Sequence, residues 1–187
     1  MMKDKLSLHD YITADRMDYF PSLSKGYLVD WLLKSEQYWL RTFVKYLRKE
    51  EYFTFYRPNW ILKYYYKRKK NILGRKLSFF INAGNFGQGL KISHYGSIIV
   101  HPNARIGNNC TLHGNCCIGS KGSLPDVAPI VGDNVDIGQG AQILGDIIIA
   151  DGVKIGAGSI VVKSVLETNV TVAGVPARII NNDNIIE

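Results

Sequence analysis

Residues 131–166 read VGDNVD IGQGAQ ILGDII IADGVK IGAGSI VVKSVL, and an aliphatic residue opens every group of six. The opening positions are Val131, Ile137, Ile143, Ile149, Ile155 and Val161, and the fifth positions are Val135, Ala141, Ile147, Val153, Ser159 and Val165. The same frame runs back to Ile118, Leu112 and Ile106, with one interruption at SKGSLPDVAP, residues 120–129. A repeat this short predicts a stacked β-helix, in which each group supplies a short strand and a turn and the aliphatic residue points inward.

The cysteines fit the same frame. Cys110 and Cys116 stand at the fifth position of successive groups, where other groups place Val, Ala or Ile. Small buried thiols pack there as hydrophobes. Together with Cys117 they form an odd, clustered set, which does not indicate a disulfide framework. The alternative is a reactive or metal-binding pair.

Composition changes sharply near residue 80. Before residue 81 lie 19 of the 21 aromatic residues, whereas 16 of the 18 glycines come after it. Charge divides too, because residues 1–80 hold 17 Lys and Arg against 8 Asp and Glu, and residues 81–187 hold 6 against 8. We therefore expect an α-helical domain over residues 1–82, an all-β domain over 83–180 and a tail over 181–187.

Three helical signals precede the repeat. The stretch DWLLKSEQYWLRTFVKYLRKE, residues 30–50, spaces its apolar residues mostly three and four apart and predicts an amphipathic helix. Pro58 is suited to opening the next helix. The stretch SLHD, beginning at Ser7, matches a capping-box start for a short earlier helix.

The sequence has no run of 18 apolar residues and no visible signal peptide, so a cytoplasmic protein is expected. The basic first half suits an anionic partner. Nucleic acid is disfavoured, because packing within the helical domain accounts for the aromatic residues more simply. Peripheral contact of the basic helix near Tyr64–Arg75 with a membrane stays open as a weaker alternative.

The ending VAGVPARII, after IGAGSIVVKSV, resembles that of the bacterial hexapeptide-repeat acyltransferases, and residues 85–180 are most similar to their serine acetyltransferase branch. This resemblance implies a left-handed parallel β-helix, a homotrimer, and acetyl-CoA bound in clefts between neighbouring prisms, with no metal. It leaves open a dimer of trimers joined by the N-terminal helices.

Within that resemblance, SHYGS at residues 93–97 stands where the family has its DHATG-type motif. It implies that His94 is the general base, with His113 close to it one coil later as a second catalytic candidate. An imidazole is suited to accepting a hydroxyl proton, so transfer is expected to be direct, without an acyl-enzyme. A metal site built from His94, His101 and His113 is the rival interpretation.

The departures from the family shape the predicted acceptor. Ser93 replaces the acidic residue of the motif, Val127–Pro129 replace an Arg-His-Pro, and Phe79 replaces the aspartate that orients the histidine. Loss of an acid and a cation weakens the grip on a zwitterion. We therefore predict acetyl transfer to a sugar hydroxyl of a polysaccharide precursor, by analogy with enzymes of capsule and exopolysaccharide clusters, with serine as the alternative acceptor.

The resemblance also implies contacts to acetyl-CoA from turns and cations of the repeat. These are Gly119, Ser120, Gly138, Gln139, Lys154, Ala157, Lys163 and Arg178. Lysine and arginine are suited to the phosphates of the cofactor, and a backbone amide such as that of Ala157 is suited to its pantetheine arm.

Overall fold

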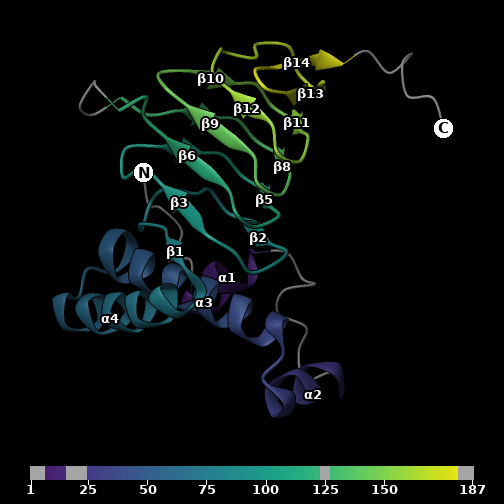
Figure 1. The fold of residues 1–187 in the computed structure, drawn as a ribbon. Helices are drawn as coiled ribbons and strands as arrows, with labels where there is room; N and C mark the ends of the chain where they lie inside the picture. The colour runs from purple at the N-terminus through teal and green to yellow at the C-terminus, as the bar shows by residue number, and fades with distance from the viewer. Residues whose placement is uncertain (1–6, 16–24, 123–126, 181–187) are drawn as a thin grey trace.

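The structure, a computed structural model, describes residues 7–15, 25–122 and 127–180. Figure 1 shows a stack of short strands standing on a layer of helices. The helices are α1 (Leu8–Thr13), α2 (Lys25–Leu33), α3 (Glu36–Glu51), a π-helical turn η2 (Tyr52–Tyr56) and α4 (Trp60–Leu77). None of the helices in the described part of the chain is long and apolar enough to cross a membrane.

Short strands follow the helices. They are β1 (Phe79–Phe80), β2 (Lys91–Ile92), β3 (Ile98–Val100), β4 (Arg105–Ile106), β5 (Thr111–Leu112), β6 (Cys117–Gly119), β7 (Ile130–Val131), β8 (Asp136–Ile137), β9 (Gln142–Leu144), β10 (Ile148–Ile149), β11 (Lys154–Ile155), β12 (Ile160–Val161), β13 (Thr171–Gly174) and β14 (Ala177–Ile180).

Among the described residues the strands form three sheets, which are the sides of a left-handed parallel β-helix. Sheet A has the order β1-β3-β6-β9-β12, sheet B β10-β7-β4, and sheet C β14-β13-β11-β8-β5-β2. Consecutive strands visit sheets C, A and B in turn, so each coil turns three corners. Every strand pair is parallel except the closing hairpin β13–β14. The predicted fold class is confirmed.

The six-residue frame forms the core of the prism. The opening aliphatic residues are buried, and identical positions stack in register, as Leu112, Ile137 and Ile155 do in sheet C. The fifth positions are buried at the corners, except that Val165 at the last coil is only partly covered. Apolar burial of this kind contributes about 25 cal/mol per Å², so the stacked core is the main source of the prism's stability.

The helix predicted over residues 30–50 is broken, which corrects that prediction. Lys34 adopts a left-handed φ of 52°, and Ser35 caps α3 by accepting a hydrogen bond from the Tyr38 N–H. Ser35 also donates to Asp30 at 2.8 Å, which ties the end of α2 to the start of α3. Local side-chain bonds of serine and aspartate compete with helix continuation, so the apolar spacing alone was misleading here. The capping box at Ser7 is confirmed, with Asp10 as its acidic partner.

The helical layer joins the prism through both apolar and ionic contacts. Phe43 on α3 packs edge-on against Phe79 of β1, with ring centroids 5.1 Å apart. The buried Arg48 guanidinium binds Asp15 and Glu51 and donates to the carbonyls of Phe86 and Gly87 at the start of the prism. Helices and prism therefore share one core, and the division at residues 82 and 83 stays a prediction.

Candidate active site

The loop that carries His94 connects β2 to β3 and is held by the first turn of α3. The Tyr95 N–H donates to Glu36 Oε1 at 2.6 Å, and Gln37 Nε2 donates to the Ser93 carbonyl at 3.3 Å. The His94 ring lies beside the same carboxylate, with Nδ1 3.5 Å from Glu36 Oε2. The His94 side chain is 60% exposed, so its other ring nitrogen is accessible to a substrate.

A second histidine–carboxylate pair lies on the next coils of sheet C. His113 follows β5, and its Nε2 lies 2.8 Å from Asp136 Oδ1 on β8. Both side chains are partly exposed. A carboxylate only accepts hydrogen bonds, so each pair fixes which ring nitrogen carries the hydrogen. The ring nitrogen without a hydrogen, which can accept a proton, is therefore Nε2 in His94 and Nδ1 in His113.

Both histidines lie at the corner between sheets C and A, but they are not stacked on one another. The Ser93 N–H donates to the Leu112 carbonyl and the His113 N–H donates to the Ile137 carbonyl, so His113 continues the column of Ser93. His94 stands one residue further along its loop. Gly114 lies beneath that loop, where an added Cβ would meet the Tyr95 carbonyl oxygen at 2.5 Å. The expected stacking of His113 on His94 is thus displaced by one residue.

His101 lies apart from the other two histidines. It follows β3 at the corner between sheets A and B, and its Nδ1 accepts a hydrogen bond from the Asn103 N–H at 3.2 Å. Across residues 7–15, 25–122 and 127–180, no group of three or more His, Cys, Asp or Glu residues is placed to hold a metal ion. Within one chain, the three-histidine metal site is therefore not assembled.

The residues assigned to acetyl-CoA divide between two corners and one face. Gly138, Gln139 and Ala157 lie at the corner of His94 and His113, in the turns after β8 and β11. Gly119 and Ser120 lie at the corner between sheets A and B, as does Lys163 after β12. Lys154 and Arg178 stand exposed on β11 and β14 of sheet C. One chain does not gather them all around a single point.

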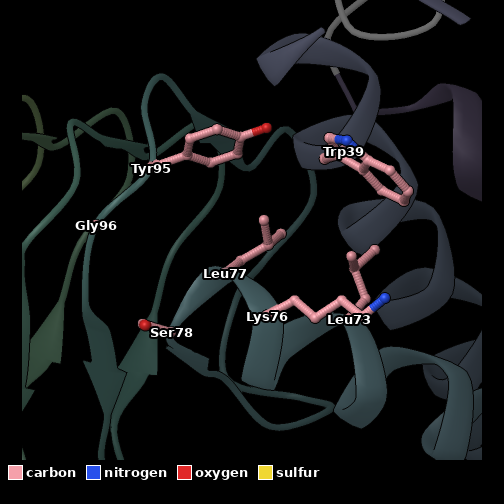
Figure 2. Close-up of a pocket in the computed structure, with 7 residues that line it drawn as sticks. All are labelled: Trp39, Leu73, Lys76, Leu77, Ser78, Tyr95 and Gly96. Carbon is pink, nitrogen blue, oxygen red and sulfur yellow. The ribbon is translucent and has the colours of Figure 1, made fainter. Parts of the chain in front are cut away.

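A cavity of about 450 Å³ lies behind the loop of His94, between the prism and the helices. Figure 2 shows Tyr95 and Gly96 on one side and Trp39 with the end of α4 on the other. Its lining is mostly aromatic and aliphatic, and among the described residues Lys76 alone brings a charge to it. The described lining offers no opposed pair of charges, so the cavity is poorly suited to a zwitterionic ligand.

The three thiols are unsuited to nucleophilic chemistry at neutral pH. Cys110 and Cys116 are fully buried in the prism, and Cys117 is partly buried. Burial raises the pKa of Cys110 to about 11 and raises the pKa of Cys116 and Cys117 as well. Thiolate is the reactive form, so these groups stay inert. The structural interpretation of Cys110 and Cys116 agrees with this burial.

Sequence reasoning missed both carboxylates. Glu36 lies 58 residues from His94, and its place after the cap residue Ser35 indicates only a helix start. Asp136 carried a usable signal. Asp136 immediately precedes the repeat position Ile137, just as Thr111 precedes the repeat position Leu112. If residues 120–129 are treated as an insertion in the repeat, these two groups become neighbours in the stack, and Asp136 lies beside Thr111. Phe79, at the position of the family's orienting aspartate, is buried against Phe43 and orients nothing.

A left-handed β-helix built on a six-residue repeat defines the class of hexapeptide-repeat proteins. No family model matches the sequence. Among curated proteins, it is similar to the serine acetyltransferase of Staphylococcus xylosus, with 38% identity over 128 residues that cover 63% of this chain and 59% of the relative.

Solved structures agree. Serine acetyltransferase from Brucella abortus matches with a TM-score of 0.66 and 30% identity, over 92% of this chain and 67% of that one, and the same enzyme is also known in complex with coenzyme A. Soybean serine acetyltransferase complexed with serine matches with a TM-score of 0.70 and 25% identity, over 93% and 70%. The chain belongs to the serine acetyltransferase branch of the hexapeptide-repeat acetyltransferases.

These findings contradict the sugar acceptor predicted from the missing clamp residues. The relatives at 34–41% identity are serine acetyltransferases, which favours the alternative acceptor, serine. The altered positions were misleading because a missing side chain shows only that one contact is lost, and other positions can supply the same charge. The chain spans between 36% and 61% of the length of the curated relatives it was compared with.

Proposed function

We propose that the protein transfers the acetyl group of acetyl-CoA to the side-chain hydroxyl of serine. The observation that carries the proposal is the placement of His94 against Glu36 at an exposed corner. The sequence resemblance assigns the family's catalytic motif to the same residues. The complexes of related enzymes with coenzyme A and with serine support the two substrates.

His94 is the general base of this proposal, and Glu36 is its positioning residue. With Nδ1–H directed at the Glu36 carboxylate, Nε2 carries the lone pair that accepts the serine proton. The Tyr95 N–H fixes Glu36 from the other side, so the loop and the carboxylate hold one another. Glu36 also stabilises the imidazolium that forms as the proton moves.

The transfer proceeds in one ternary complex. The serine hydroxyl oxygen attacks the thioester carbonyl carbon while His94 Nε2 takes its proton, which gives a tetrahedral oxyanion. The carbon–sulfur bond then breaks, and the departing CoA sulfur takes the proton back from the imidazolium. Acetylserine and CoA are released and His94 is neutral again. A general base of this kind contributes roughly 10²–10⁴-fold to the rate.

The outer face of sheet C provides charges of both signs for a zwitterion. Lys91, Thr111, Asp136 and Lys154 stand in register on β2, β5, β8 and β11. Neighbouring strands lie about 4.8 Å apart, so a lysine and a carboxylate on adjacent strands match the spacing of an amino acid's two charges. We assign the serine ammonium group to Asp136 and its carboxylate to Lys154 on the adjacent strand, in place of the family's Arg-His-Pro.

Acetyl-CoA is assigned to the turns of the later coils and to exposed cations. Gln139 and Ala157 lie in turns beside the histidine corner, next to Gly138, whose own N–H donates to the Ile155 carbonyl. Lys163 and Gly119 lie at another corner. The two sets fit one cofactor only if one corner of a prism lies beside a different corner of the next prism. This division supports a homotrimer with the cofactor between subunits.

Exposed isoleucines on the outside of the prism also support self-assembly. Ile130 and Ile148 pair in register on sheet B and are 53% and 49% exposed. Apolar pairs on an outer strand face are typical of a covered surface. Light scattering is expected to give about three times the chain mass of 21.0 kDa, and Ile148→Arg is expected to lower it. A constant mass of one chain would exclude the trimer.

The test of function is thiol release from acetyl-CoA with a panel of hydroxyl acceptors. We expect serine to accelerate release and sugars and glycerol to leave it at the background rate. His101→Ala is the matched control, because it removes a histidine from another corner. If serine does not accelerate thiol release from acetyl-CoA by the native protein, the proposal is wrong.

The residue roles are tested separately from the function. His94→Ala is expected to lower kcat by roughly 10²–10⁴-fold. Glu36→Gln keeps an acceptor for the Tyr95 N–H but turns an amide donor towards His94, so kcat should fall and the pH–rate profile should shift with little change in KM. If His94→Ala retains activity and His113→Ala abolishes it, the base is His113 held by Asp136, and the acetyl transfer itself still stands.

A further inference from the structure

A basic, aromatic groove runs along the helical layer and shares no lining residue with the cavity beside the His94 loop among the described residues. It has a volume of about 370 Å³ and is formed by α3 with parts of α2 and α4. Figure 1 shows α3 and α4 side by side, with α2 at the end of α3. The volume falls in the range of about 300–1,000 Å³ that is usual for small-molecule sites. We call it the α3 groove.

Three cations line the α3 groove on one face of α3. Arg41, Lys45 and Lys49 are spaced four residues apart, so they lie in a row along the helix. In the part of the chain that the structure describes, no acidic residue lines the groove, and Asp30 outside it pairs with Arg41 at 3.0 Å. Within the described residues no carboxylate lies within ion-pair distance of Lys45 or Lys49. Like charges at this spacing destabilise a helix, which favours an anionic ligand between them.

The guanidinium of Arg41 is only partly paired. Its Nη1 binds Asp30, whereas its buried Nε–H has no hydrogen-bond partner among the described residues. A buried donor left unpaired costs about 1–3 kcal/mol, so positive charge here is incompletely compensated by the protein. Burial, together with the neighbouring Lys49, also lowers the pKa of Lys45, as expected where positive charge is concentrated and partly removed from water.

Aromatic rings form the rest of the lining. Tyr65 and Trp31 are 52% and 47% exposed, and the Lys69 ammonium lies 5.6 Å from the ring centroid of Tyr65. The Lys34 ammonium lies 4.5 Å from the ring centroids of both Trp31 and Tyr38, and the Lys49 ammonium lies 4.8 Å from that of Tyr66. Stacking of a base on an aromatic ring contributes about 1–3 kcal/mol, and Arg and Lys bind phosphate oxygens through charge-assisted bonds.

We propose that the α3 groove binds a nucleoside di- or triphosphate, with its phosphates on Arg41, Lys45 and Lys49 and its base on the ring of Tyr65. This site is separate from that of acetyl-CoA and does not depend on the proposed acetyl transfer. The motif YYYKRKK thereby gains a role through Tyr65 and Tyr66, which line the groove, whereas Lys67 and Arg68 lie outside its lining.

Calorimetric titration of the full chain with ATP, inorganic tripolyphosphate and adenosine tests the proposal. Lys45→Gln/Lys49→Gln is expected to weaken ATP binding at least about tenfold, since each charge-assisted bond contributes about 1.5–3 kcal/mol. Lys67→Gln/Arg68→Gln removes the same charge from exposed positions and is the matched control. Tyr65→Leu is expected to weaken ATP but not tripolyphosphate. Unchanged circular dichroism and melting temperatures show that the variants are folded.

Three results would overturn the proposal. If ATP binding is lost in Lys163→Gln/Arg178→Gln and retained in Lys45→Gln/Lys49→Gln, ATP occupies the site assigned to acetyl-CoA. If tripolyphosphate binds as tightly as ATP and Tyr65→Leu changes neither, the groove recognises phosphate alone. If phosphatidylserine vesicles bind through Lys45 and Lys49 while ATP does not, the groove faces a membrane.

Discussion

The prism and the helical layer bury their residues in different ways. Inside the prism the buried side chains are nearly all apolar and repeat along each sheet, as Ile118, Ile143 and Val161 do in sheet A. Where the helices meet the prism, the chain buries ion pairs instead. Arg48 is 1% exposed and joins Asp15 to Glu51, and Lys70 binds Glu50 at 2.9 Å.

This difference indicates where single substitutions should destabilise the molecule most. A repeated apolar core shares its contacts among equivalent layers, so the loss of one side chain is a local defect. A buried ion cluster occurs once and has to be complete, because any unpaired charge in it is desolvated without compensation. We expect the junction between helices and prism to depend more on single residues than the prism interior does.

Arg48→Met should therefore have the largest effect on stability. It leaves the carboxylates of Asp15 and Glu51 buried without a cation, and removal of one partner from such a cluster costs about 4 kcal/mol. Urea unfolding followed by circular dichroism measures the loss. Arg57→Met, at an exposed arginine, is the control and should change the unfolding free energy by less than about 0.5 kcal/mol. Equal losses of unfolding free energy in both variants would mean that the buried arginine is no more sensitive to substitution than an exposed one.

Ile143→Ala tests the other side of the comparison. Ile143 is fully buried between Ile118 and Val161, so truncation leaves a cavity and costs about 3 kcal/mol. The defect should stay local. Hydrogen exchange is expected to accelerate mainly in the neighbouring coils, with the amides of α3 keeping their protection. A uniform loss of protection across prism and helices would mean that the two regions unfold as one unit.

The same contrast explains what the sequence predicts about the fold. The six-residue frame identifies the buried positions of the prism directly, because every group of six forms the same short strand and turn with its aliphatic residue directed inward. The helical layer has no such redundancy. The break between α2 and α3 depends on Ser35 bonding both Tyr38 and Asp30, and the π-helical turn at Tyr52–Tyr56 follows no pattern of apolar spacing. The Arg48 cluster joins residues from distant segments, which spacing does not reveal.

The candidate site divides in the same way. The place of His94 and His113 near one corner follows from the repeat and from the family motif. Their partners come from tertiary contacts. Glu36 reaches the loop from another element, and Asp136 lies across an irregular insertion. The acceptor prediction was wrong because it treated a lost arginine and aspartate as a lost function, whereas the relatives favour serine.

The buried cysteines of the prism predict a loss of stability in alkali. Burial raises the pKa of Cys110 from 9.0 to about 11, so the unfolded chain releases this proton before the folded one does. The stabilisation is complete below pH 9 and is lost as pH rises towards 11, by about 2–3 kcal/mol. Unfolding free energies at pH 8 and pH 11 should fall less steeply in Cys110→Ala than in the native protein. If the unfolding free energy falls equally steeply with pH in both proteins, ionisation of buried Cys110 is not the cause of the alkaline loss of stability.

The smallest effect is expected at the turns that separate the coils. Asn134 adopts a left-handed φ of 58°, as Asn109 and Asn169 do at equivalent turns, and Gly152 takes the same conformation with a φ of 69°. A side chain without asparagine's local hydrogen bonds is strained there, so Asn134→Ala should cost about 1 kcal/mol, while Asn134→Gly should be nearly neutral. Melting temperatures of the pair measure the difference. If Asn134→Ala is as stable as Asn134→Gly, the left-handed backbone conformation is not the reason for asparagine at this position.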